Sequence, residues 1–462
     1  MRLFLLLSFL STSFFCSAKT PTNVIVIFTD DQGYNDLGSF GSKTIKTPNL
    51  DKMAREGRKF TSFYVASPVC SPSRAALLTG CYPKRIGMEK GVLFPTSKHG
   101  LHPDEYTLAD YFSSHGYATA CIGKWHLGHL PEVLPTSNGF DSYFGIPYSN
   151  DMNHPDNKNR PKSGPDGMDI LWNDPESTLT KMNTPLMKNE KIIELPVDQR
   201  TITRCYTDQA ITFIKESNKA KKPFFLYLPH SMPHIPLYVP EGVQDPNPKN
   251  AYRNVIEHID EQVGRIFSEL QNSGLQNNTL VVFTSDNGPW LRFKHHGGSA
   301  YPLRDGKTTN FEGGQRVPCL MWAPSMIPPN TTCNELISTL DLLPSLATLT
   351  NTALPTKHSC DGFDNSSIIL GGHGSHRSHF LYYTTEGKLA GIRSGEWKLL
   401  RSQTKNQKKP ELLLFDLSKD ISEKLNLASQ KPDKVASLKK MMTKLDDEIS
   451  QNQRKPWGNP KH

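Results

Sequence analysis

Four apolar runs along the chain predict buried β-strands. They lie within segments 23–33, 117–126, 223–234 and 279–288. Runs that are apolar at nearly every position are typical of strands covered on both faces of a parallel sheet. Helix-like segments separate them, and the one at 254–274 places apolar residues on one face before a terminal glycine. This alternation predicts an α/β domain with a large, mostly parallel sheet flanked by helices.

Polar and charged side chains follow each run at the point where the predicted strand ends. They are Asp30, Asp31, Lys124, His126, His230, His234, Asp286 and Asn287. Ligands of open α/β sheets bind outside the carboxyl ends of the strands, so we expect these side chains to form one site. An acidic pair after a strand can instead be a turn or a helix cap, but four such ends together favour a site. The carboxylates and the amide offer oxygen ligands, which predicts Ca²⁺ or Mg²⁺ rather than zinc.

The stretch CSPSRAALLTG places Cys70 at the start of a predicted helix. Pro72 suits a first helical turn, the Ala and Leu residues favour a helix, and Gly80 predicts its end. A helix N-terminus attracts anions and lowers the pKa of a thiol, and Arg74 adds a cation suited to an oxyanion. Alone, the stretch leaves three interpretations open: a structural cysteine that could pair with Cys81, a thiolate nucleophile, or a function that depends on the whole motif.

Residues 1–18 are typical of an export signal, with Arg2, an apolar run and small residues before the expected cleavage site. That run is short for a membrane span, so we expect an exported protein (secreted, periplasmic or lysosomal) without stable membrane insertion. The chain has eight cysteines, and removal of the signal would remove Cys16. Seven cysteines then remain, so at least one of them lies outside any disulfide. The net charge of +8 favours an anionic substrate without separating sulfated glycan, nucleic acid and membrane surface.

Several motifs resemble those of one enzyme family, the type I (formylglycine-dependent) sulfatases of the alkaline phosphatase superfamily. Cys-x-Pro-Ser-Arg at 70–74, followed by an Ala/Leu helix and Thr-Gly, is similar to the first signature of that family. GYATACIGKWH at 116–126 is similar to the second. The resemblance continues through TSDNG and PLRDGKTTNFEGGQRVP to ELLLFDLSKDISEKLNLA. Within the family, the chain resembles arylsulfatases and N-acetylgalactosamine-6-sulfatases. Asn35 stands where relatives often have Gly.

The resemblance implies an alkaline phosphatase-like catalytic domain at 19–374 and a smaller subdomain at 375–462, made of antiparallel strands and a helix. It implies that a formylglycine-generating or equivalent maturation enzyme oxidises Cys70 to Cα-formylglycine. A divalent cation, Ca²⁺ rather than Mg²⁺, is expected on this residue and the strand-end oxygens. The implied metal ligands are Asp30, Asp31, Cys70, Asp286 and Asn287.

The resemblance also assigns roles in the hydrolysis of a sulfate monoester. The implied catalytic residues are Cys70, Arg74, Lys124, His126, His230 and Lys307. One hydroxyl of the hydrated formylglycine would attack sulfur, and the other would expel sulfate. Arg74 would support residue 70, and the two lysines would neutralise the sulfate.

Histidines are expected to move the protons. His126 is the expected base for the second step, and His230 the expected acid for the leaving alcohol, with Lys307 assisting. A structural role for His234 is as reasonable as a catalytic one. Ser149 and Asn150 lie where relatives bring substrate contacts.

The expected substrate is a sulfated small molecule or, preferably, a sulfated carbohydrate, and no nucleic acid. The polar segment 148–196 is expected to form part of the pocket rim. A basic face could meet a polyanionic glycan or simply be solvated; it comprises Lys398, Arg401, Lys405, Lys408 and Lys409. The alternatives are a phosphatase or phosphodiesterase of the same superfamily, which typically has Thr or Ser as nucleophile, and an inactive exported glycan-binding protein.

Overall fold

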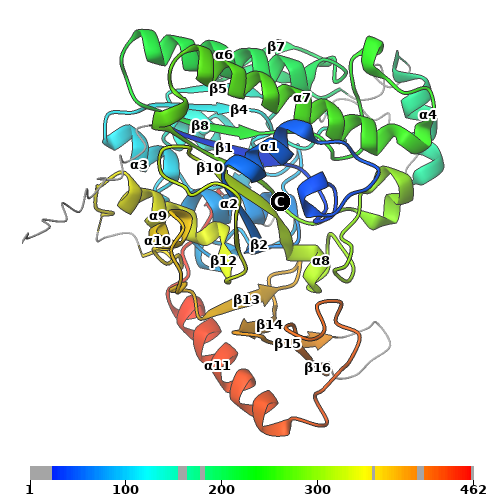
Figure 1. Ribbon diagram of the computed structural model, residues 1–462, viewed down its shortest axis with the longest axis vertical. Coiled ribbons are helices and arrows are strands. Elements are labelled where there is room, and N and C mark those ends of the chain that lie inside the picture. Colours follow the sequence, from blue (N-terminus) through cyan, green and yellow to red (C-terminus); the bar gives the residue numbers. More distant parts are fainter. Residues whose placement is uncertain (1–22, 154–163, 177–182, 356–358, 403–409, 459–462) are drawn as a thin grey trace, which may run out of the picture.

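The computed structural model describes residues 23–153, 164–176, 183–355, 359–402 and 410–458. The export signal expected at 1–18 lies outside this part of the chain. A large mixed sheet runs through the main body, and a smaller sheet with a long helix lies below it (Figure 1). Among the described helices, none combines the length and the apolar character that a membrane span requires.

The large sheet has the strand order β11-β2-β10-β9-β1-β8-β4-β5-β6-β7, with β12 beside β2. Its strands are β1 (Asn23–Thr29), β2 (Arg58–Tyr64), β4 (Ala118–Ile122), β5 (Ser142–Gly145), β6 (Leu186–Lys188), β7 (Lys191–Glu194), β8 (Phe224–Pro229), β9 (Thr279–Ser285), β10 (Arg316–Trp322), β11 (Thr331–Cys333) and β12 (Ile337–Ser338). The neighbours β9, β1, β8, β4 and β5 are all parallel, whereas β10 runs antiparallel to β9 and β2. The four apolar runs of the sequence form the four adjacent strands β9, β1, β8 and β4, and the predicted mostly parallel sheet is confirmed.

Helices cover both faces of the large sheet (Figure 1). One face carries α1 (Pro48–Glu56), α4 (Pro165–Asn173), α6 (Ile202–Lys219) and α7 (Ala251–Asn272); the other carries α2 (Cys70–Thr79), α3 (Leu108–Ser114), α9 (Leu342–Leu349) and α10 (Ser366–Ile369). Along β1, Val24, Val26 and Phe28 pack on the α2 side. Ile25 and Ile27 pack on the α7 side. Burial on both faces explains why the run is apolar at every position.

The central strands end at the same edge of the sheet. Phe28 lies opposite Pro229 of β8, and Thr29 lies opposite Ser285 of β9. Residues that follow these strands are consequently neighbours in space, although the paired residues of β1 and β9 are more than 250 positions apart in sequence. This register brings the polar strand ends together.

The smaller sheet is antiparallel, in the order β13-β14-β15-β16, and begins after residue 375. Its strands are β13 (His379–Tyr383), β14 (Leu389–Ser394), β15 (Trp397–Ser402) and β16 (Glu411–Asp416). Helix α11 (Pro432–Gln451) packs on it through Leu438, Met442 and Ile449. After α11, β17 (Trp457–Gly458) pairs with β3 (His99–Gly100) of the main body.

Lys398 corrects the expectation of an exposed basic face on this subdomain. Its side chain is fully buried, with Nζ 2.9 Å from Glu312 Oε1 and 2.8 Å from Glu423 Oε1. Glu312 begins α8 (Glu312–Gln315) in the main body, so the lysine is part of the junction between the two sheets. Arg401 is partly exposed, and the other three basic residues of the expected face lie outside the described residues.

Candidate functional site

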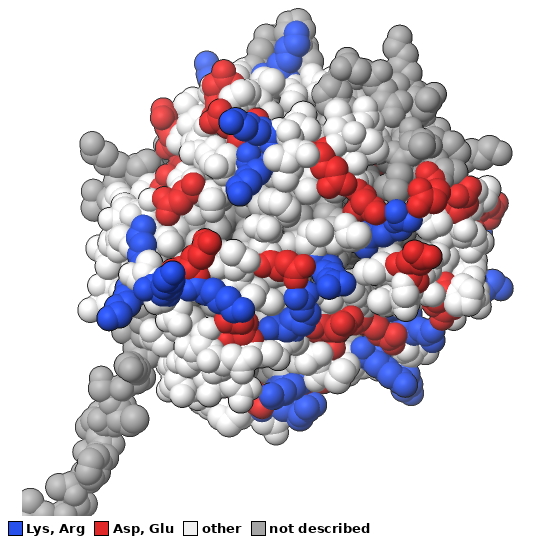
Figure 2. All heavy atoms as spheres, turned by 90° about the horizontal axis from the view of Figure 1, so that it is seen from above, with Lys and Arg blue, Asp and Glu red and all other residues white. Residues whose placement is uncertain are grey.

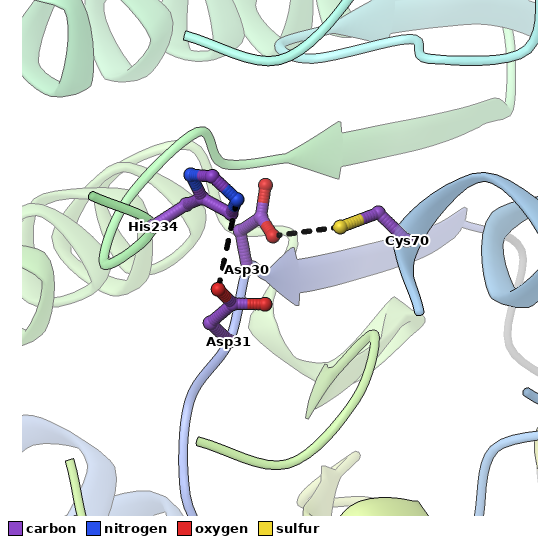
Figure 3. Close-up of side chains that lie close together, drawn as sticks. All are labelled: Asp30, Asp31, Cys70 and His234. Carbon is purple, nitrogen blue, oxygen red and sulfur yellow. Dashed lines mark hydrogen bonds and ion pairs between the residues drawn. The ribbon is translucent and has the colours of Figure 1, made fainter. Parts of the chain in front are cut away.

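Cys70 meets the end of β1 at the start of α2. Its Sγ atom lies 3.6 Å from Asp30 Oδ1 and 3.5 Å from Lys307 Nζ. Figure 3 shows the thiol pointing from the first turn of α2 toward the carboxylate that follows β1. The residue is almost completely buried. The predicted position at a helix N-terminus is confirmed, and its neighbours are charged.

Four side chains that follow β1 and β9 form what we call the strand-end cluster: Asp30, Asp31, Asp286 and Asn287. The Asp31 backbone N–H donates to Asp286 Oδ1 at 3.1 Å, and Asn287 Nδ2 donates to Asp31 Oδ1 at 2.7 Å. Asp31 has a φ of +63°, and this left-handed conformation turns the chain sharply at the strand end. All four side chains are buried, so three carboxylates share a small volume away from water.

Three cations balance these carboxylates. Arg74 donates to Asp286 Oδ2 from Nε at 3.0 Å and from Nη2 at 2.7 Å. Lys124 Nζ lies 2.5 Å from Asp30 Oδ2, and Lys307 Nζ lies 2.8 Å from Asp31 Oδ2. Arg74 is one turn along α2 from Cys70, while the lysines come from loops after β4 and β9. The structure thus brings the three predicted cations to one cluster.

The pKa values at this site follow from burial and from these pairs. Burial, followed by the charge of Asp30, raises the pKa of the Cys70 thiol, and Lys124 and Lys307 only partly oppose this. The expectation of a lowered thiol pKa was therefore wrong, because it considered the helix N-terminus without the adjacent carboxylate. Burial also opposes ionisation of Asp30, but Lys124 and Arg74 outweigh it and hold its pKa well below the usual range.

His126 lies beside the same charges. Its Nε2 atom is 2.9 Å from the Leu93 carbonyl oxygen, to which it donates when protonated, while Nδ1 is buried without a hydrogen-bond partner among the described residues. Burial, and then the positive charges of Lys124 and Arg74, lower the pKa of the ring. His126 is therefore a neutral imidazole at pH 7, with Nδ1 able to accept a proton.

The two histidines after β8 lie in different surroundings. His234 Nε2 is 3.7 Å from Asp31 Oδ2, as Figure 3 shows, and its Nδ1 lies 2.6 Å from the Ile235 carbonyl oxygen. The His230 ring instead lies 6.4 Å from the ring of Tyr206 on α6. Burial, followed by the charge of His258 on α7, lowers the pKa of His230 to about 3. Of the two, the structure places His234 at the strand-end cluster and His230 on the α6–α7 side of the sheet.

Ser149 and Asn150 support the site from the loop after β5. Lys124 Nζ donates to Ser149 Oγ at 3.0 Å. Asn150 Nδ2 donates to the carbonyl oxygen of Pro236 at 3.1 Å, two residues after His234. Through this contact Asn150 holds the loop that carries the histidine.

Trp290 is a site residue that the sequence reasoning missed. Its ring lies 5.5 Å from the ring of His234, and Lys307 Nζ lies 4.3 Å from its centroid, a cation–π distance. The residue is partly exposed. Its position three residues after Asn287 was the available signal, because side chains that follow a central strand lie at the same edge of the sheet.

Together these groups suit the binding of a tetrahedral oxyanion. Buried cations stabilise negative charge strongly because little water screens them. The oxygen atoms of the strand-end cluster also suit a hard divalent cation. The site therefore combines cations that can neutralise an anionic group, oxygen atoms that can hold a metal, and the neighbouring Cys70 and His234, with His126 beside the same charges.

Comparisons with known proteins agree on one family. The family model described as Sulfatase matches residues 22–352. Arylsulfatase G of Rattus norvegicus is 38% identical over 79% of this chain and 72% of its own length. N-acetylgalactosamine-6-sulfatase of Canis lupus familiaris is 35% identical over 79% of this chain and 69% of its own. The crystal structure of Ps i-CgsB in complex with k-i-k-neocarrahexaose is similar with a TM-score of 0.78 and 29% identity, over 96% of this chain and 95% of that one.

Proposed function

The chain belongs to the sulfatase family and is a sulfuric ester hydrolase, and we propose that it acts on a sulfated carbohydrate, with a Cα-formylglycine made from Cys70 as nucleophile. The observation that carries the proposal is the convergence of Arg74, Lys124 and Lys307 on the carboxylates around Cys70. A sulfate monoester requires a nucleophile at sulfur and neutralisation of its oxygens, and this buried site offers both.

The properties of the thiol support its oxidation. Burial and Asp30 raise the pKa of Cys70, whereas a nucleophilic cysteine needs the thiolate form. An unmodified Cys70 is therefore a poor nucleophile at pH 7. A hydrated aldehyde at this position supplies two hydroxyl groups, one to attack sulfur and one to expel sulfate. We infer that a formylglycine-generating enzyme, or an equivalent one, matures the protein.

The donor set of the strand-end cluster supports a Ca²⁺ site. Asp30, Asp31 and Asp286 contribute carboxylate oxygens, and Asn287 Oδ1 is buried without a hydrogen-bond partner among the described residues. Mg²⁺ usually keeps several waters, whereas Ca²⁺ accepts many protein oxygens, so the buried set favours Ca²⁺. A Ca²⁺ ion held by these residues would supply Lewis-acid chemistry, polarising a sulfate oxygen and lowering the pKa of a nearby hydroxyl.

The cations of the chain bind and orient the sulfate. Lys124 and Lys307 reach the carboxylates on either side of the cluster, and each also acts on the pKa of Cys70. Their charges hold the three sulfate oxygens and offset the charge that develops on the leaving oxygen. Arg74 keeps Asp286 fixed through two hydrogen bonds to one carboxylate oxygen.

We assign the proton transfers to His126 and His234. The Nδ1–H of His234 donates to the Ile235 carbonyl oxygen, which leaves Nε2 directed at the site. Burial and then Lys307 lower the pKa of His234, and the negative charge of a bound sulfate raises it, so substrate binding favours the protonated acid. His126, with its open Nδ1, accepts a proton in the second step. We therefore assign the role of general acid for the leaving alcohol to His234 and not, as the sequence predicted, to His230.

The substrate class rests on the proteins that this chain resembles. N-acetylgalactosamine-6-sulfatase is named for a sulfated sugar, and Ps i-CgsB was crystallised with k-i-k-neocarrahexaose. We also propose a catalytic domain at 19–374 and a subdomain at 375–462, since the second sheet begins at β13. Export by the signal at 1–18 places the enzyme where sulfated glycans occur.

Sulfate release tests the proposed function. The full chain is produced together with a formylglycine-generating enzyme and supplied with nitrophenyl sulfate, sulfated N-acetylgalactosamine and the matching phosphate ester. We expect sulfate release that Cys70→Ala and Cys70→Ser each reduce at least about 1,000-fold. A preference for the phosphate ester would indicate a phosphatase. Glycan binding without any ester hydrolysis would indicate a binding protein.

Removal of divalent cations tests the metal assignment. Because the cation would supply several kcal/mol of charge stabilisation, we expect exhaustive treatment with EGTA to lower sulfate release at least about 100-fold. Added Ca²⁺ should restore it better than Mg²⁺. Undiminished hydrolysis after the metal content has fallen to zero would contradict a catalytic cation.

A further inference from the structure

A second group of metal-binding side chains lies outside the strand-end cluster. Asp169 is on α4, and His295 and His296 end the 3₁₀ helix η8 (Leu291–His296). The Nε2 atoms of both histidines lie 2.7 Å from the same oxygen, Asp169 Oδ1. The three ligand atoms lie within 4.8 Å of one another. We call this group the α4–η8 cluster.

The backbone of η8 turns two consecutive histidines to one side. Neighbouring residues of a regular helix point about 100° apart, which would separate these rings. Lys294, however, has φ 51° and ψ −115°, well outside helical values. The two rings follow it with their centroids 4.6 Å apart and both Nε2 atoms directed at Asp169. The local conformation therefore presents a convergent pair of imidazoles.

The hydrogen bonding of the cluster is incomplete. His296 is 1% exposed, and its Nδ1 has no hydrogen-bond partner among the described residues. Both Nε2 atoms share one carboxylate oxygen, so both rings must carry their protons on Nε2 to make these contacts.

We propose that Asp169, His295 and His296 bind one Zn²⁺ ion. Two imidazole nitrogens and one carboxylate oxygen are a ligand set that suits zinc, whereas Ca²⁺ and Mg²⁺ require oxygen ligands. On binding, each neutral ring coordinates the metal through Nε2 and carries its one proton on Nδ1 instead, and the fourth tetrahedral position remains for water. Asp169 and His295 are about one-third exposed, at 33% and 28%, which gives the ion access from solvent.

Zinc at this position would join the rim segment to the loop that borders the catalytic site. Helix α4 belongs to the polar segment 148–196, and η8 begins directly after Trp290. The Trp290 ring lies 4.7 Å from Phe293 of η8 and 5.5 Å from His234. A metal bond between α4 and η8 thus fixes the segment that carries Trp290, and the proposed binding itself does not depend on the sulfatase mechanism.

Titration of the untagged full-length enzyme with ZnCl₂ tests the proposal, in excess Ca²⁺ so that the strand-end cluster is occupied. The variants are Asp169→Asn and His295→Gln, both at partly exposed positions, and His373→Ala is the matched control because that side chain is 87% exposed. We expect one zinc per wild-type chain and per control chain, with at least about 100-fold weaker binding in both cluster variants. X-ray absorption at zinc should show nitrogen and oxygen ligands at about 2.0–2.2 Å.

Two results would overturn the proposal. The first is zinc binding by Asp169→Asn and His295→Gln that equals that of the wild type, which would place the ion elsewhere. The second is no stoichiometric zinc on the wild type at micromolar concentration, which would assign the cluster to hydrogen bonding alone. Denaturant unfolding of each variant, measured without zinc, separates a lost ligand from a lost fold.

Discussion

His230 and His234 show which features of the site residues can be predicted from the sequence and which cannot. Both follow β8, and both are placed by the rule that side chains after a central strand lie at the edge where ligands bind. Only the structure separates them, because the loop after the strand sends His230 toward Tyr206 and returns His234 to Asp31. The types and edge of the site residues were predictable, but the direction of each side chain in an irregular loop was not.

The different surroundings of His230 and His234 predict different effects on kcat when each is substituted. His234→Ala should lower kcat about 100-fold or more, because the leaving alcohol loses its proton donor. His230→Asn, the matched control, should leave kcat within a few-fold, since its ring faces α6 and α7. Sulfate release at saturating substrate measures both. The reverse order of effects would return the acid role to His230.

His230 should instead affect stability as a function of pH. Its folded pKa of about 3 lies below the ordinary value of 6.5, so the unfolded chain binds the proton more readily. The contribution of the neutral ring is complete above pH 6.5 and is lost as the pH falls toward 3. Relative to His230→Asn, the wild type should therefore lose about 2 kcal/mol of unfolding free energy between about pH 7.5 and about pH 5.

Denaturant unfolding of both proteins at each pH measures this difference. The comparison with the variant removes the contributions of other buried acids and histidines, which are common to both proteins. Parallel stability curves for the two proteins would show that His230 does not remain neutral in the folded protein.

At the level of elements, the central strands were predictable because burial on both faces makes them apolar throughout. The junction between the two sheets was not. Lys398 lies in a strand beside Leu399 and Leu400, and all three side chains are buried, since α11 packs on one face of the sheet and the main body lies at the other. The pairing of β17 with β3 could not be predicted from local sequence patterns either, because it joins residues more than 350 positions apart.

Removing Lys398 should destabilise this junction. Lys398→Met leaves Glu312 and Glu423 buried without their shared cation, and such a change costs about 3 kcal/mol. Lys388→Met, at an exposed position of the same subdomain, should change stability by less than about 0.5 kcal/mol. Urea unfolding compares the two. Equal stability of both variants would show that the buried charges do not hold the junction.

At the level of the whole molecule, the net charge indicates an anionic substrate less clearly than the buried charges of the site do. The net charge of +8 suggested attraction of an anionic substrate. On the face seen in Figure 2, however, Lys and Arg side chains lie among Asp and Glu, without a continuous field of one sign. The positive charges that matter for the proposed reaction are instead buried at residue 70, where Arg74, Lys124 and Lys307 gather.

The proposed reaction depends most on the chemical state of residue 70. The direct measurement is mass spectrometry of the tryptic peptide that contains Cys70 and ends at Arg74, from protein produced together with a formylglycine-generating enzyme. Conversion of CH₂SH to CHO lowers the mass by about 18 Da, in contrast to the gain of oxygen atoms in ordinary thiol oxidation. We predict that loss in enzyme that releases sulfate. A residue that remains thiol or disulfide in folded protein from such cells would contradict a formylglycine nucleophile at position 70.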